Sequence, residues 1–174
     1  MCTIPRAHER EVERRIALKN PPAPVRLEIR YADLDPYGHV NNAIYLAFFE
    51  QVRFAYWNAL ADLAGITERE AGDVPGARYV IAETTLRFKA PTFFDHTLHG
   101  AATVPWIGNR SYAMDFELRN GETFEAGETA CEGSAAHVFY DPVKNEVQSR
   151  PDWFLPTVAA LEGRPEDDFA SSER

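Results

Sequence analysis

The 174-residue chain has the composition of one ordinary globular domain, with 45% hydrophobic and 26% charged residues. Its formal net charge of −9 argues against a general nucleic-acid binder, because neutralising phosphates needs a concentrated basic surface. The sequence has no apolar run long enough for a transmembrane helix, so no membrane partner is expected.

Residues 1–24 are predicted to form an arm outside the main domain. The segment from His8 to Lys19 is rich in Arg and Glu and has few apolar residues, which favours at most a short, weakly amphipathic helix. The prolines at positions 21, 22 and 24 then end it. The N-terminal arginines are not followed by an apolar segment, so no signal peptide is predicted and the expected location is cytoplasmic.

A polar loop, residues 33–42, follows a predicted strand over residues 25–31 in which apolar and charged side chains alternate. Its stretch Asp35-Pro36-Tyr37-Gly38 has the composition of a turn, because proline presets φ and glycine accepts positive φ. Asn41 or Asn42 is a natural N-cap for the helix that follows.

The predicted helix, residues 42–64, carries apolar side chains on nearly every side, and Gly65 supplies a stop signal. Such a helix is expected to be enclosed by the rest of the fold. Its first backbone N–H groups have no acceptor within the helix, so together with the macrodipole they favour a developing negative charge. We therefore expect the active site at the junction of loop and helix.

From residue 78 onward the apolar pattern has a period of two, which is typical of strands. Asn120-Gly121 is a strong hairpin signal between two such runs. Residues 151–162 are expected to add a helical turn or two, and the polar tail, residues 163–174, is expected to be disordered. One strand, one long helix and four further strands form an α+β pattern. The four further strands are predicted at residues 78–88, 98–106, 112–118 and 123–140.

The pattern D-x-D-x-x-G-H-V-N-N-x-x-Y-x-x-x-x-E-x-x-R runs from Asp33 to Arg53. It resembles the hotdog-fold thioesterases of the 4-hydroxybenzoyl-CoA thioesterase type, which hydrolyse acyl-CoA. The resemblance implies a hotdog fold over residues 25–162, with a five-stranded antiparallel sheet wrapped around one long central helix. It also implies that Asp35 is the catalytic carboxylate and that the backbone N–H of Asn42 polarises the thioester carbonyl.

Each residue of this pattern also has an ordinary structural interpretation. Aspartates in turns usually cap backbone N–H groups, and Asp33 is the more structural member of its pair. His39 either holds Asp35 in position or carries a proton, since the imidazole of an unperturbed histidine changes charge close to neutral pH. Glu50 stands among apolar neighbours on the helix and needs a partner. That partner is Arg53, three residues on, or else Glu50 is a second carboxylate near the catalytic loop.

The resemblance implies a coenzyme A thioester as partner. Because the chain has a net negative charge, the phosphates of coenzyme A need nearby cations on the protein. Arg110 is the first candidate, because the resembled family has a basic residue before a serine at that position. Arg87 and Lys89, at the end of one predicted strand, are weaker candidates. No cofactor is expected. No metal site is expected either, because His96 and His99 lie on opposite faces of a predicted strand and the other histidines are scattered.

Thioester hydrolysis needs an attacking oxygen and a place for negative charge on the carbonyl oxygen. Asp35 is predicted to act as general base or as nucleophile, and the sequence leaves both open. Serine and cysteine catalysis are disfavoured, because no G-x-S-x-G motif is present and Cys2 and Cys131 lack a neighbouring histidine in a loop. The alternatives are an acyl-ACP thioesterase, a hotdog hydratase or dehydratase, and a non-catalytic acyl-CoA binding module.

Self-association is predicted from the same resemblance. In the resembled family the strand that matches residues 78–88 pairs with its twin across a two-fold axis. Such pairing removes an exposed sheet edge. We therefore expect a homodimer or a tetramer of dimers, with the helix-start site at the subunit interface.

Overall fold

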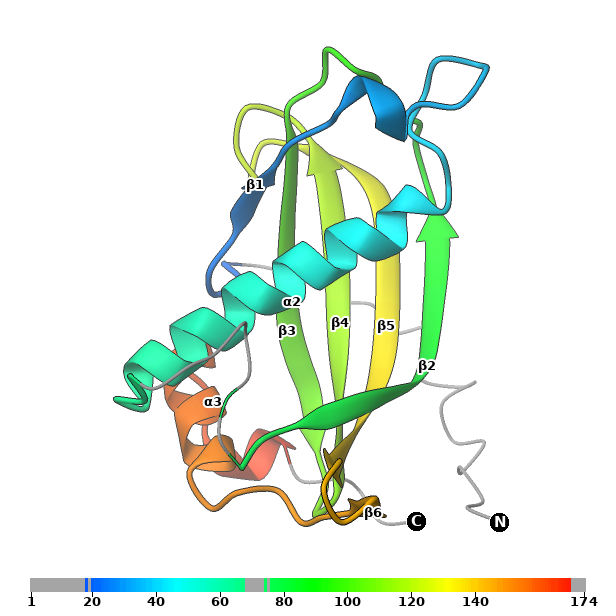
Figure 1. Cartoon of the computed structure of the whole chain (residues 1–174). Helices are drawn as coiled ribbons and strands as arrows, with labels where there is room; N and C mark the ends of the chain where they lie inside the picture. Colours follow the sequence, from blue (N-terminus) through cyan, green and yellow to red (C-terminus); the bar gives the residue numbers. More distant parts are fainter. Residues whose placement is uncertain (1–17, 19, 68–73, 75, 170–174) are drawn as a thin grey trace.

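The computed structural model describes residues 18, 20–67, 74 and 76–169. The predicted helix in the N-terminal arm lies almost wholly outside these residues. The described part of the chain forms an antiparallel sheet in the order β1-β3-β4-β5-β2, with the short β6 paired to β5 (Figure 1). The strands are β1 (Val25–Leu27), β2 (Tyr79–Phe88), β3 (Leu98–Ile107), β4 (Ser111–Asn120), β5 (Glu128–Asp141) and β6 (Glu146–Val147). The helices are α2 (Ile44–Leu63) and α3 (Phe154–Glu162), with 3-10 turns η1 (Tyr31–Asp33) and η2 (Glu166–Phe169).

The long helix α2 lies across one face of the sheet, as the hotdog fold requires (Figure 1). Glycines on two strands allow this close approach: a Cβ at Gly100 would overlap the side chain of Val52, and one at Gly133 would overlap Phe49. The ring of Phe49 stacks on Phe116 of β4 with centroids 4.8 Å apart. The predicted α+β fold with five antiparallel strands and one central helix is confirmed.

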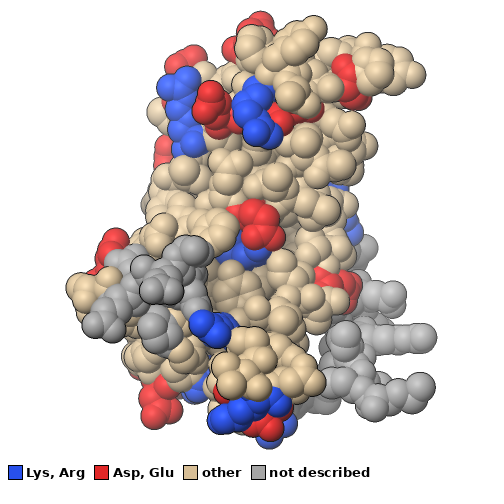
Figure 2. Space-filling view, in the orientation of Figure 1, with Lys and Arg blue, Asp and Glu red and all other residues tan. Residues whose placement is uncertain are grey.

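The expectation that α2 is enclosed on all sides is wrong for one face. Leu46 is 47% exposed and Phe54 is 45% exposed. Figure 2 shows that this side of the molecule carries few charged groups between its two ends. A large apolar surface on a helix is typical of a face that another chain covers.

Strand β2 forms one edge of the sheet and pairs only with β5 among the described strands. Its register shifts between Ile81 and Glu83, so a bulge at Ala82 interrupts the strict alternation predicted for residues 78–88. Val80 and Ile81 are exposed on this free edge. A ten-residue edge with exposed apolar side chains is a surface that proteins usually cover or pair.

The connection between β4 and β5 is longer than the predicted Asn120-Gly121 hairpin. Strand β5 begins at Glu128, and residues 121–127 form a loop. Phe124 holds this loop in place, because its ring is buried and the guanidinium of Arg119 lies 4.4 Å from its centroid. Packing of one aromatic side chain thus outweighs the local turn signal.

The predicted disorder of the C-terminal tail is wrong for residues 163–169. Helix α3 ends at Gly163, which adopts positive φ, and η2 then returns the chain to the core. Phe169 is fully buried, and the guanidinium of Arg164 lies 4.2 Å from its ring centroid. No helix among the described residues is long and apolar enough to cross a membrane.

Candidate active site

Asp33 anchors the start of the polar loop. Its buried carboxylate accepts hydrogen bonds from the backbone N–H of Arg30 at 2.8 Å and from Arg30 Nη2 at 2.7 Å. These contacts hold the pKa of Asp33 below its usual value, with the side-chain hydrogen bond as the largest cause. The carbonyl of Asp33 accepts from the N–H of Asn41 at 2.8 Å, which closes the base of the loop. These contacts are those of a structural residue, as expected for Asp33.

Asp35 and His39 face each other across the turn. One carboxylate oxygen, Oδ2, lies 3.1 Å from Nδ1 of His39, and the other accepts from the N–H of Tyr37 at 2.9 Å. The N–H of Asp35 donates to the carbonyl of His39, and Gly38 closes the turn with φ of 84°. The Asp35 side chain is 16% exposed, so the carboxylate is held in place and still reachable from solvent.

The start of α2 leaves a backbone donor next to this pair. The side chain of Asn41 accepts from the N–H of Ala43 at 3.0 Å, and its carbonyl accepts from Ile44 at 2.9 Å. The N-cap of α2 is Ala43, which makes no side-chain cap hydrogen bond, so neither Asn41 nor Asn42 occupies the predicted position, and Asn41 instead supports the turn just before the helix. The N–H of Asn42 has no acceptor among the described residues.

The loop is also tied to the adjacent end of the sheet. The N–H of Val40 donates to the carbonyl of Thr92 at 2.8 Å, and Thr92 in turn bonds the side chain of Asn120 at the end of β4. A carboxylate, an imidazole and an open N–H donor thus share one rigid eight-residue stretch. Such a set can deliver an oxygen nucleophile to a carbonyl and hold the resulting negative charge.

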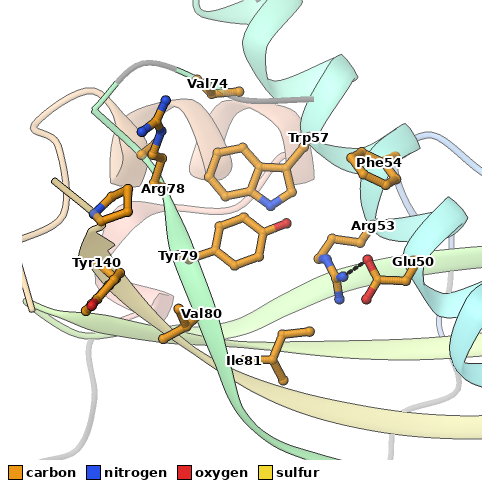
Figure 3. Close-up of a pocket in the computed structure, with 12 residues that line it drawn as sticks. Glu50, Arg53, Phe54, Trp57, Val74, Arg78, Tyr79, Val80, Ile81 and Tyr140 are labelled. Atoms are coloured by element: carbon orange, nitrogen blue, oxygen red, sulfur yellow. Dashed lines mark ion pairs between the residues drawn. The ribbon is translucent and has the colours of Figure 1, made fainter. Parts of the chain in front are cut away.

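Glu50 lies apart from this loop. It is eight residues beyond Asn42, which is about 12 Å along a helix at 1.5 Å per residue. Its carboxylate pairs with Arg53, and the ion pair is asymmetric: the Arg53 side chain is 6% exposed and the Glu50 side chain 46%. The structure therefore gives Glu50 the predicted ordinary partner, in a groove between α2 and β2 (Figure 3).

The three basic candidates lie at different ends of the sheet. Arg87 and Lys89 are exposed at the end of β2 that meets the helix start, where the rings of Tyr45 and Phe88 lie 5.1 Å apart. Lys89 pairs with Glu132 at 3.3 Å. Arg110 is exposed before β4, at the end opposite Asn120, and ten strand residues span about 30 Å. One chain therefore does not bring Arg110 and Asp35 together.

A second group of polar side chains lies beneath the groove, and no sequence pattern predicted it. His137 is fully buried, stacks on Tyr112 with centroids 4.6 Å apart, and meets Tyr79 edge-on at 5.1 Å. Burial first, and then the charge of Arg53, lowers its pKa to about 3, so its imidazole is neutral. In the sequence, the one feature that indicates the groove is the position of Trp57, one turn beyond Arg53 on the same helix face.

Comparisons with known proteins identify the family of this chain. The model of the Thioesterase-like superfamily matches residues 29–158, which is most of the chain. The chain belongs to the Thioesterase-like superfamily. This membership confirms the resemblance seen in the loop and helix. A search of curated proteins finds no match.

Solved structures share the fold of this thioesterase-like protein. A thioesterase from Thermus thermophilus, complexed with coenzyme A and Zn, is 25% identical, with a TM-score of 0.70 over 85% of this chain and 99% of that one. A 1,4-dihydroxy-2-naphthoyl-CoA thioesterase from Synechocystis is 17% identical, with a TM-score of 0.61 over 82% of this chain and 98% of that one. The second likeness shows the fold alone. Among the described residues of this chain, no cluster of three or more His, Cys, Asp or Glu side chains could hold a metal.

Proposed function

We propose that this protein is an acyl-CoA thioesterase that releases a carboxylic acid and free coenzyme A. The observation that carries the proposal is the Asp35 carboxylate, held between His39 and the Tyr37 N–H beside the open N–H of Asn42. The coenzyme A complex of the similar Thermus thioesterase supports the choice of carrier.

Asp35 can bring about the attack on the thioester carbon in one of two ways. As a base it takes a proton from water, and the hydroxyl attacks the thioester carbon. As a nucleophile it attacks directly and forms an anhydride that water then opens. In both routes the Asn42 N–H donates to the carbonyl oxygen as negative charge develops, and the C–S bond breaks as the coenzyme A thiolate leaves and gains a proton. His39 positions the carboxylate and is the nearest group able to return a proton.

A free-thiol assay on a panel of acyl-CoA esters tests this proposal. We expect thiol release from at least one short, long or aromatic acyl-CoA, at a rate that rises with enzyme concentration. Faster release from the matching acyl-ACP would favour the acyl-ACP thioesterase instead. Release from no member of the panel, in a protein that still binds acyl-CoA, would favour a binding module and overturn the proposal.

The free edge of β2 leads to a prediction about assembly. We expect the β2 strands of two protomers to pair, because this covers Val80, Ile81 and the exposed apolar face of α2. Light scattering at micromolar concentration should then give at least twice the chain mass of 19.6 kDa. A mass near that of the single chain would contradict the prediction. Phe54→Lys, which places a charge on the covered face, should shift the mass toward the monomer.

The basic side chains that could bind the phosphates of coenzyme A lead to a second prediction. We propose that Arg110 contacts a coenzyme A phosphate from across the dimer, with Arg87 and Lys89 as weaker contacts beside the helix start. Arg110→Ala should raise KM for acyl-CoA by about tenfold, the loss expected for one charge-assisted contact of about 1.5 kcal/mol. A short thioester without the nucleotide should be almost unaffected. Equal losses on both substrates would show that Arg110 supports the fold or the chemistry instead.

A further inference from the structure

The groove between α2 and β2 has a volume of 660 Å³, within the range of small-molecule sites. Most of its lining is apolar, including Phe54, Val80 and Ile81. Glu50, Arg53 and Tyr79 lie together among its polar side chains, while Arg78 and Tyr140 lie apart from them. Figure 3 shows that Arg53 and Glu50 descend from the helix while Tyr79 rises from the strand, with its hydroxyl turned toward Arg53.

Donors predominate among the polar atoms at the floor of the groove. The guanidinium of Arg53 lies 5.7 Å from the ring centroid of Tyr79, and Trp57 stacks on the same ring at 5.4 Å. The buried indole Nε1 of Trp57 and the buried Tyr112 hydroxyl interact with each other, without the geometry of a good hydrogen bond. An indole N–H can only donate, so it remains available to an oxygen acceptor with better geometry.

The ion pair of Arg53 with Glu50 does not fully account for this arrangement. A guanidinium has five N–H donors, and Arg53 interacts with the half-exposed Glu50 carboxylate and with the hydroxyl of Tyr79. A carboxylate and one hydroxyl engage about three donors, which leaves donors of this buried cation for an anionic oxygen that enters the groove.

We propose that this groove receives an acyl group that is apolar along its length and ends in a carboxylate bound by Arg53. The proposal rests on the thioesterase function given above and names its substrate class. The geometry of the dimer supports it. The Asp35 loop lies at the Phe88 end of β2 and the groove at the Tyr79 end, so two-fold pairing of β2 brings the groove of one protomer toward Asp35 of the other.

Glu50 and the substrate carboxylate compete for the same cation in this arrangement. The charged residues that line the groove are Glu50, Arg53 and Arg78. Removing the charge of Glu50 should strengthen binding of an anionic acyl end, and removing that of Arg53 should abolish it.

The test compares acyl-CoA pairs of equal chain length at several lengths, one ending in a methyl group and the other in a carboxylate, such as hexanoyl-CoA and adipoyl-CoA. The readout is the ratio of kcat/KM for the carboxylate-ended ester to that for the methyl-ended ester. We expect wild type to favour the carboxylate-ended ester by about tenfold at its best length, as one charge-assisted contact allows. Arg53→Met should bring the ratio to one or below, and Glu50→Gln should raise it further.

Arg26→Met serves as a matched control, because it removes one positive charge from an exposed site on β1, outside the groove. Its ratio should equal that of wild type. Circular dichroism checks that each variant folds. If Arg53→Met does not fold, Glu50→Gln still tests the proposal. A wild-type ratio at or below one at every length, or a ratio unmoved in Glu50→Gln, would overturn the inference. Thiol release from no ester at all would instead refute the thioesterase function itself.

Discussion

Asp35→Asn is expected to lower turnover on the best acyl-CoA by a hundredfold or more, about 2.7 kcal/mol of barrier. An amide can neither attack the thioester carbon nor accept a proton from water. The substitution keeps the size of the side chain, and Oδ1 still accepts from the N–H of Tyr37. KM and the thermal unfolding temperature should therefore change little.

Asp33→Asn offers a control within the same loop. Asp33 is buried against Arg30, whereas Asp35 contacts His39 at a partly open surface. The Asp33 variant should lose stability through its weakened contact with Arg30, while the Asp35 variant should lose rate. Turnover by Asp35→Asn close to that of wild type, in steady-state thiol release, would rule out Asp35 as base or nucleophile.

Much of the fold could be predicted because its signals are local. Helix α2 begins at Ile44 and ends at Leu63, within two residues of the predicted bounds, since the polar loop and Gly65 delimit it in the sequence. Strands β2, β3 and β4 followed from their period-two pattern in the same way, whereas β1 ends at Leu27, short of the predicted residue 31, and β5 begins at Glu128 and not at residue 123. The composition of the polar loop also placed Asp35, His39 and Asn42 together, because all three belong to one turn and the helix start.

Features that depend on contacts distant in sequence could not be predicted. The groove joins Arg53 and Trp57 of α2 to Tyr79 of β2, and no local pattern brings these residues together. The exposed stripe of α2 resembled a fully buried helix in sequence, because its apolar side chains are of the same types that fill a core. The tail was predicted to be polar and disordered because its one anchor, Phe169, stands alone among charged residues.

The C-terminal segment is held by a buried carboxylate that the sequence did not single out. The side chain of Glu162, at the end of α3, is 3% exposed. It accepts hydrogen bonds from the Tyr56 hydroxyl at 2.8 Å and from the N–H of Val104 at 2.6 Å, and it pairs with Arg164 at 3.1 Å. One side chain therefore joins α2, β3 and the C-terminal turn.

Glu162→Ala should lower the free energy of unfolding by about 3 kcal/mol, because it leaves the buried donors of Tyr56 and Val104 without an acceptor and Arg164 without its closest partner. Urea unfolding followed by circular dichroism measures the loss. Glu162→Gln keeps an oxygen acceptor in place and should lose less. Glu166→Ala, at an exposed position in η2, should change stability by no more than about 0.5 kcal/mol.

The stability difference between wild type and Glu162→Gln should depend on pH, which gives a further check on the contacts of Glu162. Burial raises the pKa of Glu162 above its ordinary value of 4.5, so the folded chain holds this proton more tightly than the unfolded chain. The stability that the carboxyl adds relative to Glu162→Gln is then fully present below pH 4.5 and declines as pH rises through the raised pKa. A difference that grows with pH instead would mean that the Tyr56, Val104 and Arg164 contacts outweigh burial and stabilise the ionised form.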